Sequence, residues 1–168
     1  MRRCGEMSEH KHEQHRHGHA CECESCHGSE HRHENTLPKV HAALNEEPEI
    51  FSESYELTFK QESSTLPVQE ALLHWGGEIL RWVKNKHGFV GHIKGFSEGT
   101  EHFWFSSTGK AINIKSSSGW SEGMDKKFTI NATAIIFGTP KKELAEYARQ
   151  CLELSIATKC PDSTLVRK

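Results

Sequence analysis

Histidine and cysteine residues crowd the first 37 positions of the chain, where side chains able to build a core are almost absent. Ala20, Leu37 and two methionines are the only clearly apolar residues there besides the cysteines. Such a segment buries too little apolar surface to offset the conformational entropy that folding removes. We therefore expect residues 1–53 to form a disordered His/Cys-rich tail and linker, and the hydrophobic core to come from residues beyond position 53.

The rest of the chain has the patterns of a small folded domain. Of the 168 residues in the chain, 35% are hydrophobic and 26% are charged, a polar balance that fits one domain plus a tail. Tyr55, Leu57 and Phe59 alternate with polar residues, which predicts a half-buried strand. The predicted domain spans residues 54–158, and a C-terminal tail is expected over 159–168.

Two helices are expected, one on each side of a run of strands. Ser64 or Thr65 offers an N-cap for the first helix, and Gly88 ends it. Its apolar residues recur at helical spacing: Val68, Leu72, Trp75, Ile79, Trp82 and Val83. Thr139 is the predicted N-cap of the second helix. The expected apolar stripe of that helix is Leu144, Tyr147, Ala148, Cys151 and Leu154.

Four short strands are expected between the helices, over residues 89–96, 102–106, 111–115 and 128–137. Glycine-containing turns join them, which is typical of an antiparallel meander. Two amphipathic helices need a sheet face to cover. The sequence therefore predicts an α+β fold, a two-layer sandwich of a mainly antiparallel sheet with two amphipathic helices, and leaves the strand order open.

The tail carries a dense set of potential metal ligands. Neutral imidazole and thiolate suit borderline and soft ions such as nickel and zinc. Cys23 and Cys26 have the C-x-x-C spacing at which two thiolates can meet on one ion. No second such pair occurs, so we expect several labile sites rather than one closed zinc finger. The predicted metal ligands are His10, His12, His15, His17, His19, Cys21, Cys23, Cys26, His27, His31 and His33.

In composition only, this segment resembles the histidine-rich extensions of nickel and zinc accessory proteins, including some hydrogenase and urease maturation factors. The resemblance implies a metallochaperone that delivers or buffers nickel or zinc for a recipient metalloprotein. No G-x-x-x-x-G-K-[ST] sequence occurs, which excludes the GTPase members of that group. Metal storage or detoxification without a specific recipient is an alternative function for the same tail.

The stretch from Cys23 to His27 also matches C-x-x-C-H, the attachment pattern of c-type haem. Such attachment accompanies export, and no apolar stretch comes after Arg2 and Arg3 as it would in a secretory signal. The tail also lacks the apolar residues needed to enclose a porphyrin. We therefore expect labile metal ions and no haem.

In the predicted domain, the most distinctive polar segment is Gly91-His92-Ile93-Lys94-Gly95. On a strand, His92 and Lys94 would share one face, and the flanking glycines would leave space beside them. Together with His102 and the hydroxyls of residues 106–108, they could form an anion or phosphate site of a small enzyme. We favour the simpler interpretation, a polar outer sheet face, and keep the enzyme as an alternative.

Charge and hydropathy narrow the range of partners. The formal net charge of -2 gives no general attraction to nucleic acid. No apolar run approaches the roughly 18 residues needed to cross a bilayer. We expect a cytoplasmic protein whose partners are metal ions and a recipient protein, with neither nucleic acid nor membrane. In that reducing compartment, Cys151 is expected as a core thiol and Cys160 as a free one.

Overall fold

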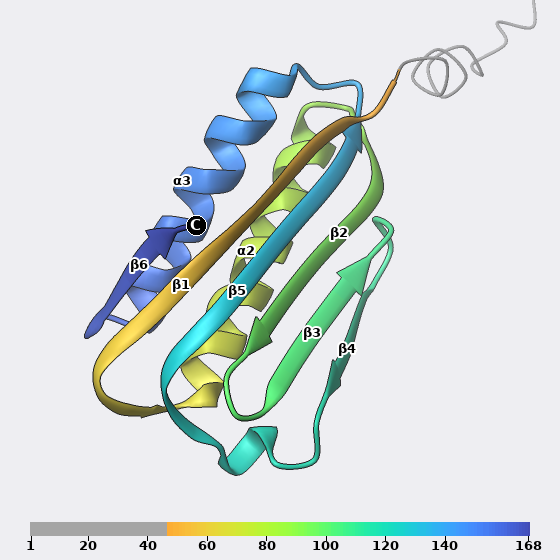
Figure 1. Cartoon of the computed structure of the whole chain (residues 1–168). Helices are drawn as coiled ribbons and strands as arrows, with labels where there is room; N and C mark the ends of the chain where they lie inside the picture. Colours follow the sequence, from red (N-terminus) through yellow and green to blue (C-terminus); the bar gives the residue numbers. More distant parts are fainter. Residues whose placement is uncertain (1–46) are drawn as a thin grey trace, which may run out of the picture. The chain divides into compact units, whose positions relative to one another are not determined.

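The computed structural model describes residues 47–168, which form a six-stranded sheet and two long helices. Every pairing between neighbouring strands is antiparallel, and both helices lie on the same face of the sheet (Figure 1). The predicted two-layer α+β sandwich is confirmed for this part of the chain. The His/Cys-rich segment, and the expectations attached to it, lie outside the described residues.

The order of the strands in the sheet differs from their order along the chain. The elements are β1 (Glu49–Ser64), α2 (Thr65–Asn85), β2 (Phe89–Glu98), β3 (His102–Ser107), β4 (Ile112–Ser116), a 3-10 turn η1 (Trp120–Glu122), β5 (Met124–Phe137), α3 (Lys141–Lys159) and β6 (Ser163–Arg167). Across the sheet the strands have the order β4-β3-β2-β5-β1-β6. The predicted meander therefore holds for β2, β3 and β4, whereas β5 returns to the middle of the sheet.

The two helices make two similar crossovers. Because β1 and β2 are both antiparallel to β5, they run parallel to each other with β5 between them. For the same reason β5 and β6 run parallel with β1 between them. The domain thus consists of two interlocked split β-α-β units, to which β3 and β4 are added as a hairpin at one edge. This hairpin widens the sheet beyond the strands that the two crossovers need.

Local sequence signals set both ends of α2. The Ser64 hydroxyl accepts a hydrogen bond from the backbone N–H of Leu66, as expected of an N-cap. At the other end, His87 adopts a left-handed φ of 57° and its N–H donates to the carbonyl of Lys84. A Cβ at Gly88 would lie 2.8 Å from the carbonyl oxygen of Phe137, so close packing requires the glycine. Helix α2 therefore ends before Gly88, as the sequence predicted.

The core contains a ring packed against two glycines. A Cβ at Gly95 of β2 would overlap the ring of Phe105, and one at Gly76 of α2 would lie 2.6 Å from it. Phe105 also packs edge-on against Trp75, with ring centroids 6.3 Å apart. The glycine inside α2 is therefore accounted for by the close approach of a strand side chain to the helix backbone.

Helix α3 differs from the sequence-based expectation in two respects. Pro140, with an extended backbone, occupies the N-cap of α3, while the buried hydroxyl of Thr139 has no hydrogen-bond partner within residues 47–168. The helix begins one residue later than predicted because Pro140 itself is not helical. Leu154 is 65% exposed rather than part of the apolar stripe. The buried residues of α3 are Leu144, Ala148, Leu152, Ser155 and Ile156.

The sheet extends past both predicted ends of the domain. Strand β1 begins at Glu49, and Phe51 is buried in the core, so residues 49–53 belong to the sheet and not to the predicted linker. Residues 163–167, which are part of the predicted C-terminal tail, form β6 and pair with β1. Cys160 is a free thiol, as expected, and it is buried in the core, whereas Cys151 is only partly buried and packs against the core.

Candidate functional site

Within residues 47–168, nothing covers the sheet face opposite the helices (Figure 1). Strand alternation places His92 and Lys94 on this open face and the buried Ile93 on the helix side, as predicted. On β3, His102 and Trp104 share the open face, whereas Phe103 and Phe105 point into the core. The polar candidates of the sequence therefore lie on one surface.

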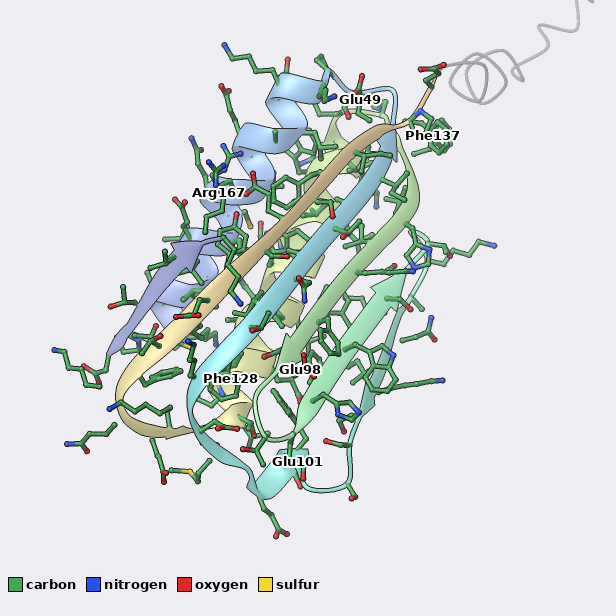
Figure 2. All side chains as sticks on the ribbon, in the orientation of Figure 1. Glu49, Glu98, Glu101, Phe128, Phe137 and Arg167 are labelled. Atoms are coloured by element: carbon green, nitrogen blue, oxygen red, sulfur yellow. The ribbon has the colours of Figure 1, made fainter. Side chains whose placement is uncertain are left out.

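A shallow hollow of about 750 Å³ lies on the open face over β2 and β3. Glu98, at the end of β2, borders it (Figure 2). The volume of the hollow falls in the range of about 300–1,000 Å³ that small-molecule sites commonly have. The side chains around it are His92, Lys94, Phe96, Glu98, His102, Trp104 and Ser106.

An aromatic row crosses the hollow. Phe96 of β2 lies directly opposite Trp104 of β3, and both are partly exposed. Trp104 stacks on His102 of its own strand, with ring centroids 5.5 Å apart and an interplanar angle of 23°. Large aromatic side chains on a solvent-facing sheet surface provide flat apolar area on which another planar group can stack.

The strand register separates the two histidines that the sequence grouped together. His102 lies opposite Glu98, whereas Lys94 lies opposite Ser106. His92 precedes Glu98 by six residues, so the backbones of the two histidines are about 20 Å apart. Lys94 and the Ser106 hydroxyl are therefore brought together as expected, but His102 joins the opposite end of the hollow.

The glycines beside His92 and Lys94 do not leave open space next to them. The ring of Phe105 fills the space at Gly95 on the helix side. Gly91 lies at the bulge between β2 and β5, where a Cβ would be 3.0 Å from the ring of Phe137. The Nε2 atom of His92 is buried there without a hydrogen-bond partner among residues 47–168.

A charged cluster on the helix side was not anticipated from the sequence. Glu53 of β1 accepts hydrogen bonds from Arg149 of α3 at 2.5 Å and 3.2 Å, and its Oε1 lies 3.2 Å from Arg167 of β6. The Tyr55 hydroxyl donates to the same carboxylate. The Arg149 hydrogen bond lowers the pKa of Glu53, and burial raises the pKa of Tyr55. The cluster ties three elements together and has a structural role.

Two further side chains that could carry chemistry, His74 and Trp120, have packing roles. The ring of His74 lies 2.9 Å from the Ser155 hydroxyl, but Ser155 is buried and donates to the Cys151 carbonyl. This contact joins α2 to α3 and leaves no accessible nucleophile. Trp120 is buried against Phe103, and its indole N–H donates to the Gln69 side chain, so it anchors the loop before β5.

The residues that the structure describes do not assemble a metal centre. Within residues 47–168, no three His, Cys, Asp or Glu side chains are grouped so that they could hold a metal ion. The predicted metal ligands, from His10 to His33, lie outside these residues. Neither α2 nor α3 has the length and apolar character needed to cross a membrane.

Comparison with known proteins adds no relative. No protein-family model, curated protein or solved structure matches the chain. The split β-α-β connectivity is a fold-level feature shared by proteins of many functions, so it does not assign one. A functional proposal must therefore rest on the ligand-rich sequence and on the chemistry of the open face.

Proposed function

We propose that this protein is a cytoplasmic accessory protein that binds nickel or zinc and delivers or buffers it for a metalloprotein. One observation carries the proposal. Eight histidines and three cysteines lie between positions 10 and 33, spaced so that many sets of ligands can meet on one ion. In this proposal the ligands exchange their ions readily, which suits transfer to a tighter site.

The folded domain has a separate part in this proposal. The folded domain recognises the recipient through a defined surface. The open sheet face offers such a surface, because it carries aromatic and charged side chains together. Storage without a recipient would require no such surface, so specific transfer to one metalloprotein distinguishes the two functions.

The enzyme alternative has weaker support once the strand register is known. Its three candidate residues are His92, Lys94 and His102, and the register places His102 at the far end of the hollow from His92. The Ser155 hydroxyl beside His74 is buried, so that pair offers no accessible nucleophile. Substituting His92 by alanine is therefore expected to leave metal binding unchanged.

Metal titration of the full chain tests the proposal. One variant replaces the eight histidines and three cysteines of residues 10–33 by serine, and the matched control replaces His92 and His102 by asparagine. Native mass spectrometry should show several nickel or zinc ions on the wild type and the control, and few or none on the serine variant. Full metal content in the serine variant would overturn the proposal.

Two further measurements sharpen the test. A shortened chain must begin at Glu47 rather than Glu53, because β1 starts at Glu49 and Phe51 belongs to the core. This chain should fold and lose the metal. Imidazole must be deprotonated to bind a metal, so the affinity of the full chain should fall as the pH drops below about 6.5. A pH-independent affinity would exclude histidine as the main ligand.

A further inference from the structure

The open face of β2 and β3 is organised in three rows that run across the strands. The register pairs Lys94 with Ser106, Phe96 with Trp104, and Glu98 with His102. On the other side of β2, the same rows continue with Thr133, Asn131 and Thr129 of β5. The middle row is therefore aromatic, and the two outer rows carry opposite charges.

The charged residues of the two outer rows, Lys94 and Glu98, are available to a ligand. Lys94 and Glu98 are both exposed. None of the ion pairs formed within residues 47–168 involves either residue. Alternate residues on one strand face lie about 7 Å apart, so the ammonium and the carboxylate flank the aromatic row on either side. A ligand that stacks on the row reaches a cation at one end and an anion at the other.

We propose that this hollow binds a mononucleotide. The base stacks on Trp104 and Phe96, because every base has a flat face that aromatic side chains attract. The phosphate lies beside Lys94 and the Ser106 hydroxyl, a cation and a hydrogen-bond donor suited to its oxygens. Glu98, at the other end, accepts a hydrogen bond from an amino or ring N–H group of the base.

This site is separate from the metal-binding segment of the proposed function. It uses no ligand between residues 10 and 33, and its volume of about 750 Å³ lies in the range of small-molecule sites. An aromatic peptide or a single nucleic-acid strand would also stack on the row. However, two cations border the row, Lys94 and Lys115 of β4, which lies opposite Trp104. Two cations suit a single phosphate better than the charged backbone of a strand, which requires several more.

The test measures binding of AMP and adenosine to the full chain by isothermal titration calorimetry in low-salt buffer with EDTA. Trp104→Ala should weaken the affinity for both ligands by about tenfold or more, because both stack. Lys94→Gln should weaken AMP by about fivefold and leave adenosine unchanged, since only AMP carries the phosphate. Lys110→Gln, an exposed lysine outside the hollow, is the control and should change neither.

The outcomes separate this proposal from the metal function. Absence of saturable AMP binding at millimolar concentration overturns the nucleotide site and leaves the metal proposal intact. AMP binding that is seen only when EDTA is left out of the buffer places the nucleotide on a bound metal and also overturns the nucleotide site. If a single-stranded oligonucleotide binds while AMP does not, the surface is a nucleic-acid platform instead. Lys94 is exposed, so Lys94→Gln should leave the fold unchanged and remains informative if Trp104→Ala fails to fold.

Discussion

The two faces of the same sheet differ in what their side chains do. On β3, Phe105 is 1% exposed and packs against Trp75 and two glycines, whereas its neighbour Trp104 faces away from the helices and stacks on His102. The covered face is packed so tightly that a single added carbon would not fit. Residues on the open face are under no such constraint, so their chemistry can be set by binding rather than by stability.

The open face carries different kinds of side chain over different strands. Over the middle of β1 and β5, polar side chains face one another, as in the contact between the Ser52 and Thr133 hydroxyls at 3.1 Å, and the exposed Ile50 lies opposite Ile135 only at one end. The aromatic side chains Phe96 and Trp104 are found instead over β2 and β3. If the open face served only to keep the protein soluble, polar side chains would continue over β2 and β3. We therefore assign the ligand to the aromatic row.

The largest effect is expected from Phe105→Ala on the covered face. Removing a buried ring between α2 and β2 leaves a cavity, and the free energy of unfolding should fall by about 3–5 kcal/mol. Urea denaturation followed by circular dichroism measures this loss. Phe105→Leu, which refills part of the cavity, is the control and should lose less. A loss below about 1 kcal/mol would show that the covered face is not the main source of stability.

The Glu53 cluster should contribute less than the core. Glu53→Gln leaves Arg149 and Arg167 without their shared carboxylate, and the free energy of unfolding should fall by about 2 kcal/mol near neutral pH. Glu146→Gln, which removes a largely exposed carboxylate on α3, should cost less than about 0.5 kcal/mol. Equal effects of the two substitutions would contradict the structural role of the cluster.

The stability difference between the wild type and Glu53→Gln should depend on pH in one direction. The folded protein holds the pKa of Glu53 below its ordinary value of 4.5, chiefly through the Arg149 hydrogen bond. A lowered pKa stabilises the fold above the unfolded value, and that stabilisation disappears as the pH falls through the folded pKa. The gap between wild type and Glu53→Gln should therefore narrow below pH 4.5. A gap that widened in acid would contradict this.

Replacing a glycine within α2 by alanine should raise the free energy of unfolding, by less than the losses described above. A Cβ at Gly77 would contact nothing within 4 Å, so Gly77→Ala should stabilise the protein by about 1 kcal/mol through helix propensity. At the adjacent Gly76, the added carbon would lie 2.6 Å from the Phe105 ring, and Gly76→Ala should destabilise instead. Thermal unfolding of the two variants measures the contrast. Stabilisation by both would mean that the two layers are less tightly packed than the structure shows.

Local patterns predicted the helices and most strands, because these depend on neighbouring residues. Alternation placed His92 and Lys94 on the correct face, and Ser64 and Gly88 marked the ends of α2. The sequence did not reveal β6, since five residues that pair at the sheet edge carry little periodic signal. The burial of Cys160 was missed for the same reason.

The candidate site was predictable in its parts but not in its arrangement. Lys94, His92 and His102 were recognised as unusual polar residues, yet their spacing depends on the β2–β3 register, which pairs Glu98 with His102. No local pattern fixes that pairing, because the turn between the strands decides it. The Glu53 cluster was missed because its arginines come from α3 and β6, far along the chain.

The most direct measurement combines stability and binding for Trp104→Ala. If the open face is free of structural duty, the free energy of unfolding should change by less than about 1 kcal/mol, whereas the AMP affinity should fall by about tenfold or more. Phe105→Ala, one residue along the same strand, provides the opposite case, with a large loss of stability. A Trp104→Ala variant that loses several kcal/mol of stability, or that binds AMP as the wild type does, would contradict the division between the two faces.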